Sequence, residues 1–315
     1  MKISIVVPVY NEAKSLPELF NEIRAILQKE KIDYEIIAIN DGSRDNSWDV
    51  LKKLGSDDKR IKALNFKWNN GQTAAMSAGI RASTGDVVIP IDSDLENDPA
   101  DIPKLLKKME EGFTVVSGWR KERWSGSAFS RKIPSVMANW LISKITGVKL
   151  HDYGCTLKAY DRDIISEVEL YGEMHRFIPA YAKWKGGRVA EIPVNYRPRK
   201  YGESNYGISR TFRVLLDLVL IKFLVKYMNR PMHFFGGLGF FSVILGLLSG
   251  TLALVLKYSY GISFISTPMP VLTTFFIIVG IQMAAMGILA EMIMRTYYES
   301  QSKTPYSIKE KINFD

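Results

Sequence analysis

The sequence has a single cysteine among its 315 residues, Cys155, so no disulfide can form within the chain. A lone cysteine suits a reducing compartment. The apolar run at residues 3–9 is too short for a secretory signal, and no small-residue cleavage site follows it. We therefore expect the N-terminal part of the chain to stay in the cytoplasm. No nucleic-acid-binding motif accompanies the net charge of +9. The charge therefore favours anionic lipid and phosphate-bearing substrates over nucleic acid.

Charged side chains make up 24% of the sequence but are absent between residues 258 and 290. The uncharged stretches 234–256 and 271–290 are each long enough to cross a hydrocarbon core of about 30 Å. Lysine and arginine concentrate before the first stretch and after the second, so the positive-inside rule predicts that both ends face the cytoplasm. We expect a multi-pass protein of the inner or plasma membrane.

Small residues repeat every four positions in the first uncharged stretch, at Ser242, Gly246 and Gly250. On a helix these residues share one face, which would allow a second helix to approach closely. The partner helix could come from the same hairpin or from another subunit. Because a two-helix hairpin is a thin bundle, we expect a dimer or a tetramer.

Short apolar runs alternate with helical patterns in the first half of the chain, which predicts an α/β fold with a mostly parallel sheet covered on both faces. The expected strands are residues 3–9, 34–40, 61–66, 86–91, 114–117, 156–160 and 189–196. The expected helices are residues 15–29, 45–54, 73–82, 99–111 and 130–146.

The composition changes along the chain predict four regions. These are a catalytic domain (1–207), an amphipathic juxtamembrane helix lying in the membrane interface (208–230), a transmembrane hairpin (231–295) and a cytoplasmic tail (296–315).

Polar motifs follow three of the expected strands, where a doubly wound sheet binds its ligands. They are Tyr10-Asn11-Glu12, Asp41-Gly42-Ser43 and Asp92-Ser93-Asp94-Leu95-Glu96. Neighbouring carboxylates such as Asp92 and Asp94 repel each other unless a cation joins them, and oxygen ligands suit Mg²⁺ or Mn²⁺. We expect a divalent ion at Asp92, Asp94 and Glu96, where it would neutralise a diphosphate leaving group. The alternative is an acidic loop that caps the following helix.

These motifs resemble those of family 2 inverting glycosyltransferases, which have the GT-A fold. More narrowly, the chain is similar to dolichyl-phosphate mannose synthases and to bacterial undecaprenyl-phosphate glucosyl- or aminoarabinosyl-type transferases. The resemblance covers residues 1 to about 210, and the two uncharged stretches match the bacterial branch. Further matching motifs are Asn70-Gly71 before an alanine-rich helix, Val116-Ser117-Gly118-Trp119-Arg120 and Tyr201-Gly202-Glu203-Ser204.

The resemblance also implies roles for individual residues. Catalytic roles fall to Asp94 and to Asp152, the latter as a base or a sugar-binding group. The metal ligands are those already named, and Glu96 stands where some relatives have glutamine. Residues implied to bind the nucleobase and ribose are Pro8, Tyr10, Glu12, Asp41, Ser43 and Asp92. Residues implied to bind donor or acceptor phosphate are Arg120, Arg131, Ser135 and Arg199, and the basic Arg197 lies in the same region.

The expected reaction is inverting transfer of a sugar, with glucose from UDP-glucose as the first choice, to a polyisoprenyl phosphate such as undecaprenyl phosphate. A processive polysaccharide synthase is disfavoured because the Gln-x-x-Arg-Trp motif is missing; Arg120 stands at the glutamine position before Arg123-Trp124. A non-catalytic membrane scaffold or sugar-binding module is disfavoured by the Asp92/Asp94 pair.

Overall fold

The computed structural model divides the chain into two compact units, Met1–Leu218 with Thr304–Asp315, and Val219–Lys303. The residues that the structure describes are 1–123, 136, 139–140, 142–144, 146–166, 168, 174–198, 200, 231–300 and 308–314. The expected juxtamembrane helix at 208–230 and most of the expected helix at 130–146 therefore lie outside the described residues.

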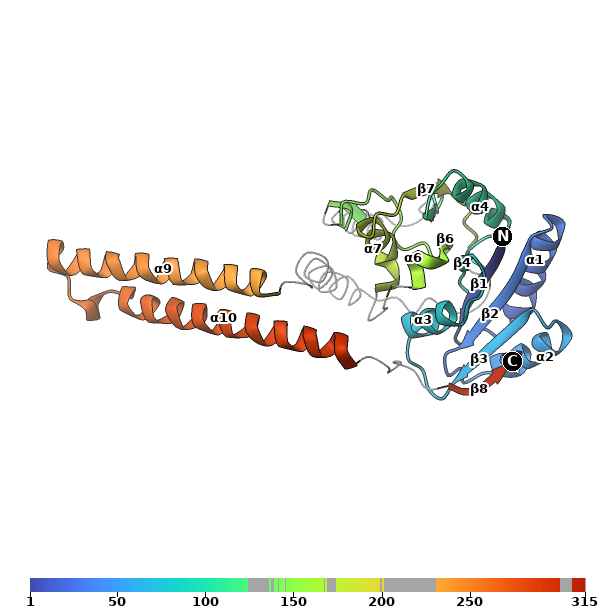
Figure 1. Cartoon of the computed structure of the whole chain (residues 1–315), viewed down its shortest axis with the longest axis horizontal. Coiled ribbons are helices and arrows are strands. Elements are labelled where there is room, and N and C mark those ends of the chain that lie inside the picture. Colours follow the sequence, from blue (N-terminus) through green and yellow to red (C-terminus); the bar gives the residue numbers. More distant parts are fainter. Residues whose placement is uncertain are drawn as a thin grey trace. The chain divides into compact units, whose positions relative to one another are not determined.

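A mixed sheet forms the centre of the first unit, with helices on both faces (Figure 1). The strand order is β7-β5-β6-β4-β1-β2-β3-β8. Strand β1 pairs in parallel with β2 and β4, β2 with β3, and β5 with β7, whereas β6 is antiparallel to both of its neighbours. The strands are β1 (Lys2–Val9), β2 (Asp33–Asn40), β3 (Ile61–Phe66), β4 (Val87–Pro90), β5 (Val115–Trp119), β6 (Lys158–Asp161), β7 (Val189–Pro193) and β8 (Ile308–Ile312).

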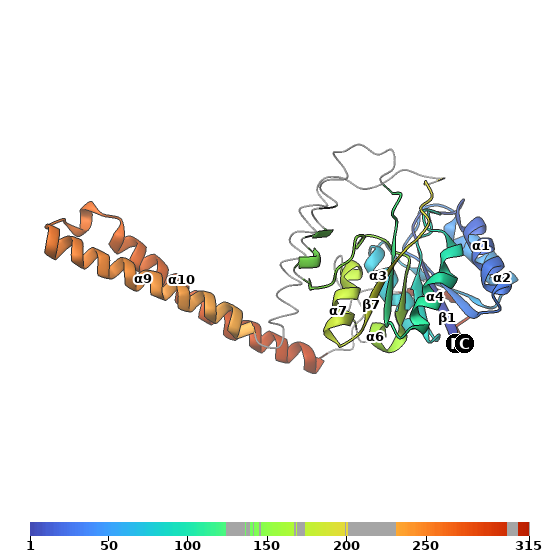
Figure 2. The same ribbon diagram turned by 90° about the horizontal axis from the view of Figure 1, so that it is seen from above.

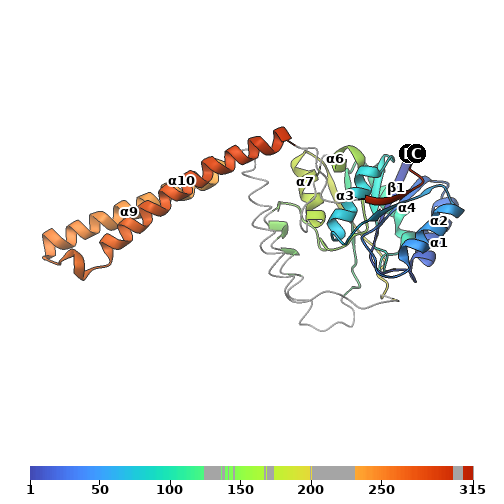
Figure 3. The same cartoon turned by 90° about the horizontal axis from the view of Figure 1, so that it is seen from below.

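The helices of this unit fall into two layers, which Figures 2 and 3 show on opposite faces of the sheet. One layer contains α1 (Leu16–Lys29), α2 (Ser47–Asp57) and α4 (Ile102–Glu110), the last preceded by η1 (Pro99–Asp101). The other layer contains α3 (Gln72–Ala82), α6 (Arg162–Ser166) and α7 (Ile178–Trp184), the last preceded by η2 (Met174–Phe177). The α/β fold and the seven expected strands are confirmed.

Both faces of the central strands are apolar, which explains the continuous hydrophobic runs in the sequence. Ile5 and Val7 of β1 pack with the layer of α1, whereas Val6 packs with the layer of α3. Helix α3 lies very close to the sheet at Gly79, where an added Cβ would come within 2.3 Å of Val6 Cγ1. The small residues of this helix therefore allow its N-terminus to reach the polar edge of the sheet.

The end of the chain differs from the expected tail, because residues 308–312 form β8 antiparallel to the edge strand β3 (Figure 1). The Trp48 indole of α2 donates a hydrogen bond to Glu310 Oε2 at 2.8 Å, and Ile312 packs into the core. Asn313 Nδ2 donates to the carbonyl oxygens of Gly55 and Ile61 at 2.8 and 2.7 Å. An edge strand that would otherwise expose its backbone groups is thus covered.

The second unit is a helical hairpin of α9 (Pro231–Tyr260) and α10 (Met269–Ser300), linked through η3 (Phe264–Ser266). By length and composition, Phe234–Tyr260 and Met269–Ala290 could each cross a membrane, and few of their residues are buried within the hairpin. Ser242 Oγ donates to the Phe276 carbonyl at 2.8 Å, and a Cβ on Gly246 would meet Ile277 at 3.0 Å. The predicted small-residue seam therefore lies within the hairpin.

Glu35 is buried at the amino-terminal end of the parallel strands, away from the edge that carries the polar motifs. Its carboxylate accepts hydrogen bonds from the Ser4 hydroxyl at 2.6 Å and the Thr84 amide at 2.7 Å, and pairs with the Lys62 ammonium at 2.9 Å. Burial alone would raise the pKa of Glu35, but these partners outweigh it and lower the pKa to about 2.

We predict that Glu35→Gln lowers the free energy of unfolding at pH 7 by up to about 3 kcal/mol, the linkage value of a pKa lowered from 4.5 to about 2. A lowered carboxylate pKa stabilises the fold above the unfolded pKa, and this contribution is lost as the pH falls toward 2. The difference from the wild type should therefore shrink to about 1 kcal/mol at pH 3. Urea unfolding of both detergent-solubilised proteins at pH 7 and pH 3 measures this difference in the free energy of unfolding. A difference of the same size at both pH values would refute the assigned role of the Glu35 carboxylate.

Candidate active site at the carboxyl edge of the sheet

Three polar motifs meet at the carboxyl edge of β1, β2 and β4. The parallel register pairs Val9 with Asn40, so the segments after β1 and β2 leave the sheet together. Ser43 Oγ accepts a hydrogen bond from the Asn11 amide at 2.9 Å. Ser93 Oγ donates to the Pro8 carbonyl at 2.9 Å, which joins the segment after β4 to the same edge. The structure thus brings together the three motifs that the sequence places after these strands.

Asp41 organises the loop that leads into α3. Its carboxylate oxygens accept hydrogen bonds from the Asn70 amide at 2.7 Å and the Gly71 amide at 2.8 Å, and its burial raises its pKa. The next residue, Gly42, has φ of 65°, and a Cβ there would lie 2.5 Å from the Trp68 carbonyl carbon. Only glycine fits this close approach. Asp41 thus has a structural role in this loop. Its expected role in holding a nucleobase stays a prediction.

Tyr10 and Glu12, both expected to bind the nucleotide, flank the turn after β1. Tyr10 is exposed at 38% of its surface, so its ring is available to a ligand. Glu12 Oε2 accepts a hydrogen bond from Ser15 Oγ at 2.8 Å, and the Glu12 amide donates to Ser47 Oγ at 2.9 Å. The turn is therefore fixed to the starts of α1 and α2.

Asp92 is held in place by two side chains from different elements. Gln72 Nε2, at the start of α3, donates to Asp92 Oδ1 at 2.8 Å, and Thr156 Oγ1 donates to Oδ2 at 2.7 Å. Burial, together with the neighbouring Asp94 carboxylate, raises the pKa of Asp92 to about 6. The sequence reasoning gave no role to Gln72, which follows the Asn70-Gly71 motif, or to Thr156, which begins the expected strand 156–160.

The carboxylate oxygens at this edge are suited to a divalent ion that is bound partly by the protein and partly by a substrate. Among the described residues, no three histidine, cysteine, aspartate or glutamate side chains gather as a metal cluster. Asp92, Asp94 and Glu96 therefore do not form a complete cage: the chain turns at Leu95, whose φ is 65°, and Asp94 Oδ1 accepts the Glu96 amide at 3.1 Å. A Mg²⁺-type ion commonly uses one or two carboxylates together with substrate phosphates, and the Asp92–Asp94 repulsion would be relieved by such an ion.

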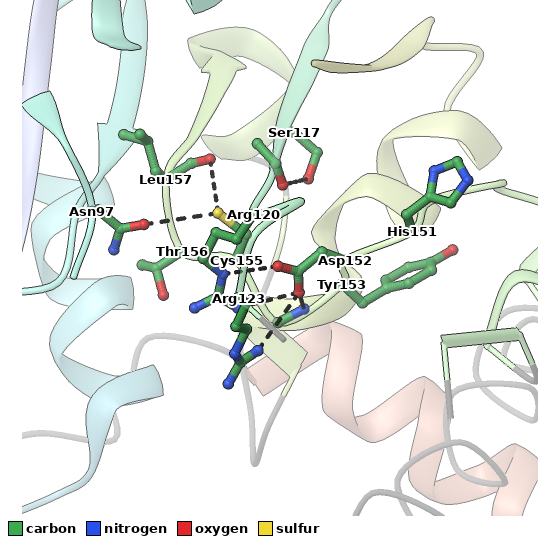
Figure 4. A network of polar contacts seen from close by, with 12 residues as sticks. Asn97, Ser117, Arg120, Arg123, His151, Asp152, Tyr153, Cys155, Thr156 and Leu157 are labelled. Carbon is green, nitrogen blue, oxygen red and sulfur yellow. Dashed lines mark hydrogen bonds and ion pairs between the residues drawn. The ribbon is translucent and has the colours of Figure 1, made fainter. Parts of the chain in front are cut away.

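Arg120 and Asp152 form a buried ion pair beside this edge (Figure 4). Arg120 Nε donates to Asp152 Oδ2 at 2.8 Å and NH2 donates to Oδ1 at 3.2 Å, which is a two-point contact. Burial opposes the charge on Asp152, but Arg120 outweighs it and holds the pKa of Asp152 below its usual range. A carboxylate of low pKa is a weak general base, so this geometry favours a positioning role for Asp152 over a proton-accepting one.

A second group of contacts fixes the backbone that carries Asp152. Glu191 of β7 accepts hydrogen bonds from the His151 amide at 2.8 Å and the Asp152 amide at 3.1 Å, and its other oxygen lies 2.6 Å from His151 Nδ1. The His151 ring stacks on Trp119, with centroids 4.3 Å apart. In Figure 4 His151 points away from the Arg120–Asp152 pair. No sequence motif signalled Glu191, because it acts across strands.

The expected phosphate-binding residues are only partly described. Arg131, Ser135 and Arg199 lie outside the described residues. Arg120 is 4% exposed and directed at Asp152, so its phosphate role stays a prediction. Arg197 pairs with Glu22 at 2.8 Å and with Asp98 at 2.7 Å. These contacts hold the segment after β7 against α1 and η1.

Comparison with known proteins identifies the family. The model of "Glycosyl transferase family 2" matches residues 4–169, which is more than half of the chain. The chain belongs to this family. The family 2 chain is 42% identical over 320 residues to the dodecaprenyl-phosphate galacturonate synthase of Rhizobium johnstonii, covering 98% of this chain and 93% of the relative. It is 35% identical to the undecaprenyl-phosphate 4-deoxy-4-formamido-L-arabinose transferase of Pseudomonas syringae, covering 98% and 90%.

Solved structures share the fold of this glycosyltransferase at low sequence identity. Mannosyl-3-phosphoglycerate synthase from Rubrobacter xylanophilus matches with a TM-score of 0.58 at 18% identity, covering 71% of this chain and 74% of that one. Glucosyl-3-phosphoglycerate synthase from Mycobacterium tuberculosis, solved with Mn²⁺ and UDP-glucose, matches with a TM-score of 0.54 at 18% identity, covering 70% and 78%. These matches confirm the expected GT-A-like mixed α/β architecture.

We predict that Asp152→Ala destabilises the glycosyltransferase by about 3–5 kcal/mol, because it leaves the Arg120 guanidinium buried without its partner carboxylate. Replacing both residues, as Arg120→Met with Asp152→Leu, should recover part of that stability, because the buried Arg120 charge is removed while Arg123 and the buried Lys158 still lose the carboxylate. Urea unfolding and sugar transfer are measured on both variants. The double variant should stay inactive, and a single variant as stable as the wild type would contradict the buried ion pair.

Proposed function

We propose that this family 2 glycosyltransferase moves a sugar from a nucleotide-sugar to a polyisoprenyl phosphate at a membrane. The observation that carries this proposal is the carboxyl edge of β1, β2 and β4, where the loop held by Asp41 continues into Gln72, which donates to Asp92. Two relatives named for polyprenyl-phosphate sugars match along 98% of this chain, including the hairpin, and support the lipid acceptor.

In the proposed reaction an oxygen of the acceptor phosphate attacks the anomeric carbon of the sugar. The bond from that carbon to the nucleoside diphosphate breaks, and the diphosphate leaves with the electron pair. Attack opposite the leaving group inverts the anomeric centre. Because the acceptor phosphate is already ionised near pH 7, no residue has to remove a proton, and positioning with charge neutralisation supplies most of the rate.

Particular side chains would serve each part of this reaction. Asp92 and Asp94 would hold a Mg²⁺ or Mn²⁺ ion, which supplies charge neutralisation at the leaving diphosphate. Gln72 and Thr156 would keep Asp92 oriented while the nucleotide enters and leaves. Asp152, fixed by Arg120, would orient the sugar by accepting hydrogen bonds from its hydroxyls.

UDP is the proposed nucleotide, as in the fold neighbour solved with UDP-glucose. Glucose is the sugar expected from the sequence, but the relatives are named for galacturonate and for a formamido-arabinose. A donor panel should therefore contain a neutral hexose, an acidic sugar and an amidated pentose.

The hairpin of α9 and α10 would anchor the enzyme in the membrane, with the catalytic unit and both chain ends in the cytoplasm. Two long apolar helices with few buried residues support the membrane anchor. The lysine and arginine residues that flank them support chain ends in the cytoplasm. The thin hairpin also supports the expectation of a dimer or tetramer, in which outward faces of several hairpins pack together.

We predict that Asp94→Ala reduces transfer from a radiolabelled UDP-sugar to undecaprenyl phosphate by at least about a thousandfold, because charge stabilisation at the leaving group is a large part of catalysis. EDTA should have a similar effect on the wild type, reversed by Mg²⁺ or Mn²⁺. Asp49→Ala, which removes an exposed acid from α2, is the matched control and should retain activity. Near-normal turnover by Asp94→Ala would refute the assignment of the acidic pair.

A further inference from the structure

The acidic segment after β4 contains carboxylates with different partners. Asp98 is the N-cap of η1, and its Oδ1 accepts a hydrogen bond from the Ala100 amide at 2.9 Å. The helix-capping role that the sequence offered as an alternative for this segment therefore belongs to Asp98. That role does not compete with an ion for Asp92 or Asp94.

The segment that follows β7 pairs with the backbone of this acidic segment. Asn97 and Tyr196 form an antiparallel bridge, and the Arg197 amide donates a hydrogen bond to the Glu96 carbonyl at 3.0 Å. Asn97 is buried, so the pairing joins the core of the unit. Residues distant in the sequence thus fix the backbone of the acidic segment at Glu96 and Asn97.

The Arg197 side chain ties this pairing to two helical elements. Its NH2 donates to Asp98 Oδ1 at 2.7 Å, at the start of η1, and its NH1 donates to Glu22 Oε2 of α1 at 2.8 Å. Asn195 Nδ2 donates to the other oxygen of Asp98 at 3.1 Å. Arg197 therefore bridges two carboxylates on different elements through charge-assisted hydrogen bonds, which are stronger than neutral ones.

Glu96 connects this brace to Asp94. Asp94 Oδ1 accepts a hydrogen bond from the Glu96 amide at 3.1 Å, and the carbonyl of Glu96 accepts the bond from Arg197. Leu95 lies between the two acids with φ of 65°, a left-handed conformation that a residue with a side chain keeps only where its surroundings hold it. Burial of Leu95 in the core and the contacts of Glu96 together hold the turn that orients the Asp94 carboxylate.

We propose that Arg197 is a positioning residue for the divalent ion. By holding Asp98 and the backbone of Glu96, it keeps the Asp94 carboxylate in the orientation that binds the ion. Arg197 then acts without contacting a phosphate, although the sequence places it beside the expected phosphate-binding residues. This inference rests on the proposed function, which supplies the ion and the diphosphate. Replacing residues that orient a metal ligand typically weakens metal binding by about 10- to 100-fold.

The test measures the affinity of the full-length protein in detergent for Mn²⁺ with UDP in excess, from the electron paramagnetic resonance signal of free Mn²⁺. Arg197→Gln should bind Mn²⁺ at least about tenfold more weakly than the wild type. Its affinity for UDP in EDTA should be unchanged, because the effect acts through the ion. Arg197→Lys keeps the charge but cannot bond to both carboxylates as the planar guanidinium does, so its affinity should be intermediate.

A second set of variants separates the two carboxylates that Arg197 bridges. Asp98→Asn should weaken Mn²⁺ binding like Arg197→Gln, while the asparagine still caps η1. Combining both changes should cost no more than the larger single loss, because the two residues act through one contact. Glu22→Gln leaves the contact with Asp98 in place and should have the smaller effect. An unchanged Mn²⁺ affinity in Asp98→Asn would overturn the proposal.

Arg60→Gln is the matched control. Arg60 forms a similarly exposed ion pair with Asp58 at 2.8 Å, directly before β3 and therefore at the opposite end of the parallel strands. Its loss should leave Mn²⁺ binding unchanged, even where urea unfolding shows lower stability.

Two results for Arg197→Gln would overturn the positioning role. One is lower stability with unchanged Mn²⁺ affinity, which indicates a structural role alone. The other is weaker UDP binding in EDTA, or a raised KM for undecaprenyl phosphate with unchanged Mn²⁺ affinity, which indicates direct contact with a phosphate. Failure of the proposed function has a different signature, since Asp94→Ala would then bind Mn²⁺ as tightly as the wild type.

Discussion

Parallel pairing of β1 with both β2 and β4 is the constraint on which the rest of the site depends. The register places the ends of these strands side by side, so the polar segments that follow them leave the sheet at one edge. Side chains buried on both faces hold that register, because a slip of one residue would turn the apolar side chains of one layer toward the other. The fixed end of β4 therefore keeps Asp92 and Asp94 close together despite the repulsion between their carboxylates.

The other half of the site is fixed by charge rather than by strand register. Arg120 and Asp152 lie 32 positions apart in the sequence. Arg120 directly follows β5, and Asp152 lies in the segment before β6. Each side chain neutralises the charge of the other where both are buried. Glu191 then holds the backbone amide of Asp152 from β7. Thr156 lies four residues after Asp152 and donates to Asp92, so the loop that carries the ion pair is also bonded to the acidic pair.

The sequence alone was sufficient to predict the apolar strands and the polar motifs that follow them. Strands with apolar runs and the motifs after them could be located because hydrophobic periodicity and turn chemistry are local signals. β8 was missed because its sequence, Ile-Lys-Glu-Lys-Ile, is mostly polar and becomes a strand only by pairing with the edge of β3. The pairing of Arg197 with Glu22 and Asp98 was equally invisible, since it joins residues distant in the chain.

The central claim is that the carboxyl edge of β1, β2 and β4 binds a nucleoside diphosphate together with a divalent ion. Calorimetric titration of UDP into the purified protein, with Mn²⁺ and then with EDTA, tests it most directly. We expect UDP to bind at least about tenfold more tightly with Mn²⁺, because the ion joins the acidic pair to the diphosphate. The same affinity for UDP in both conditions would contradict it.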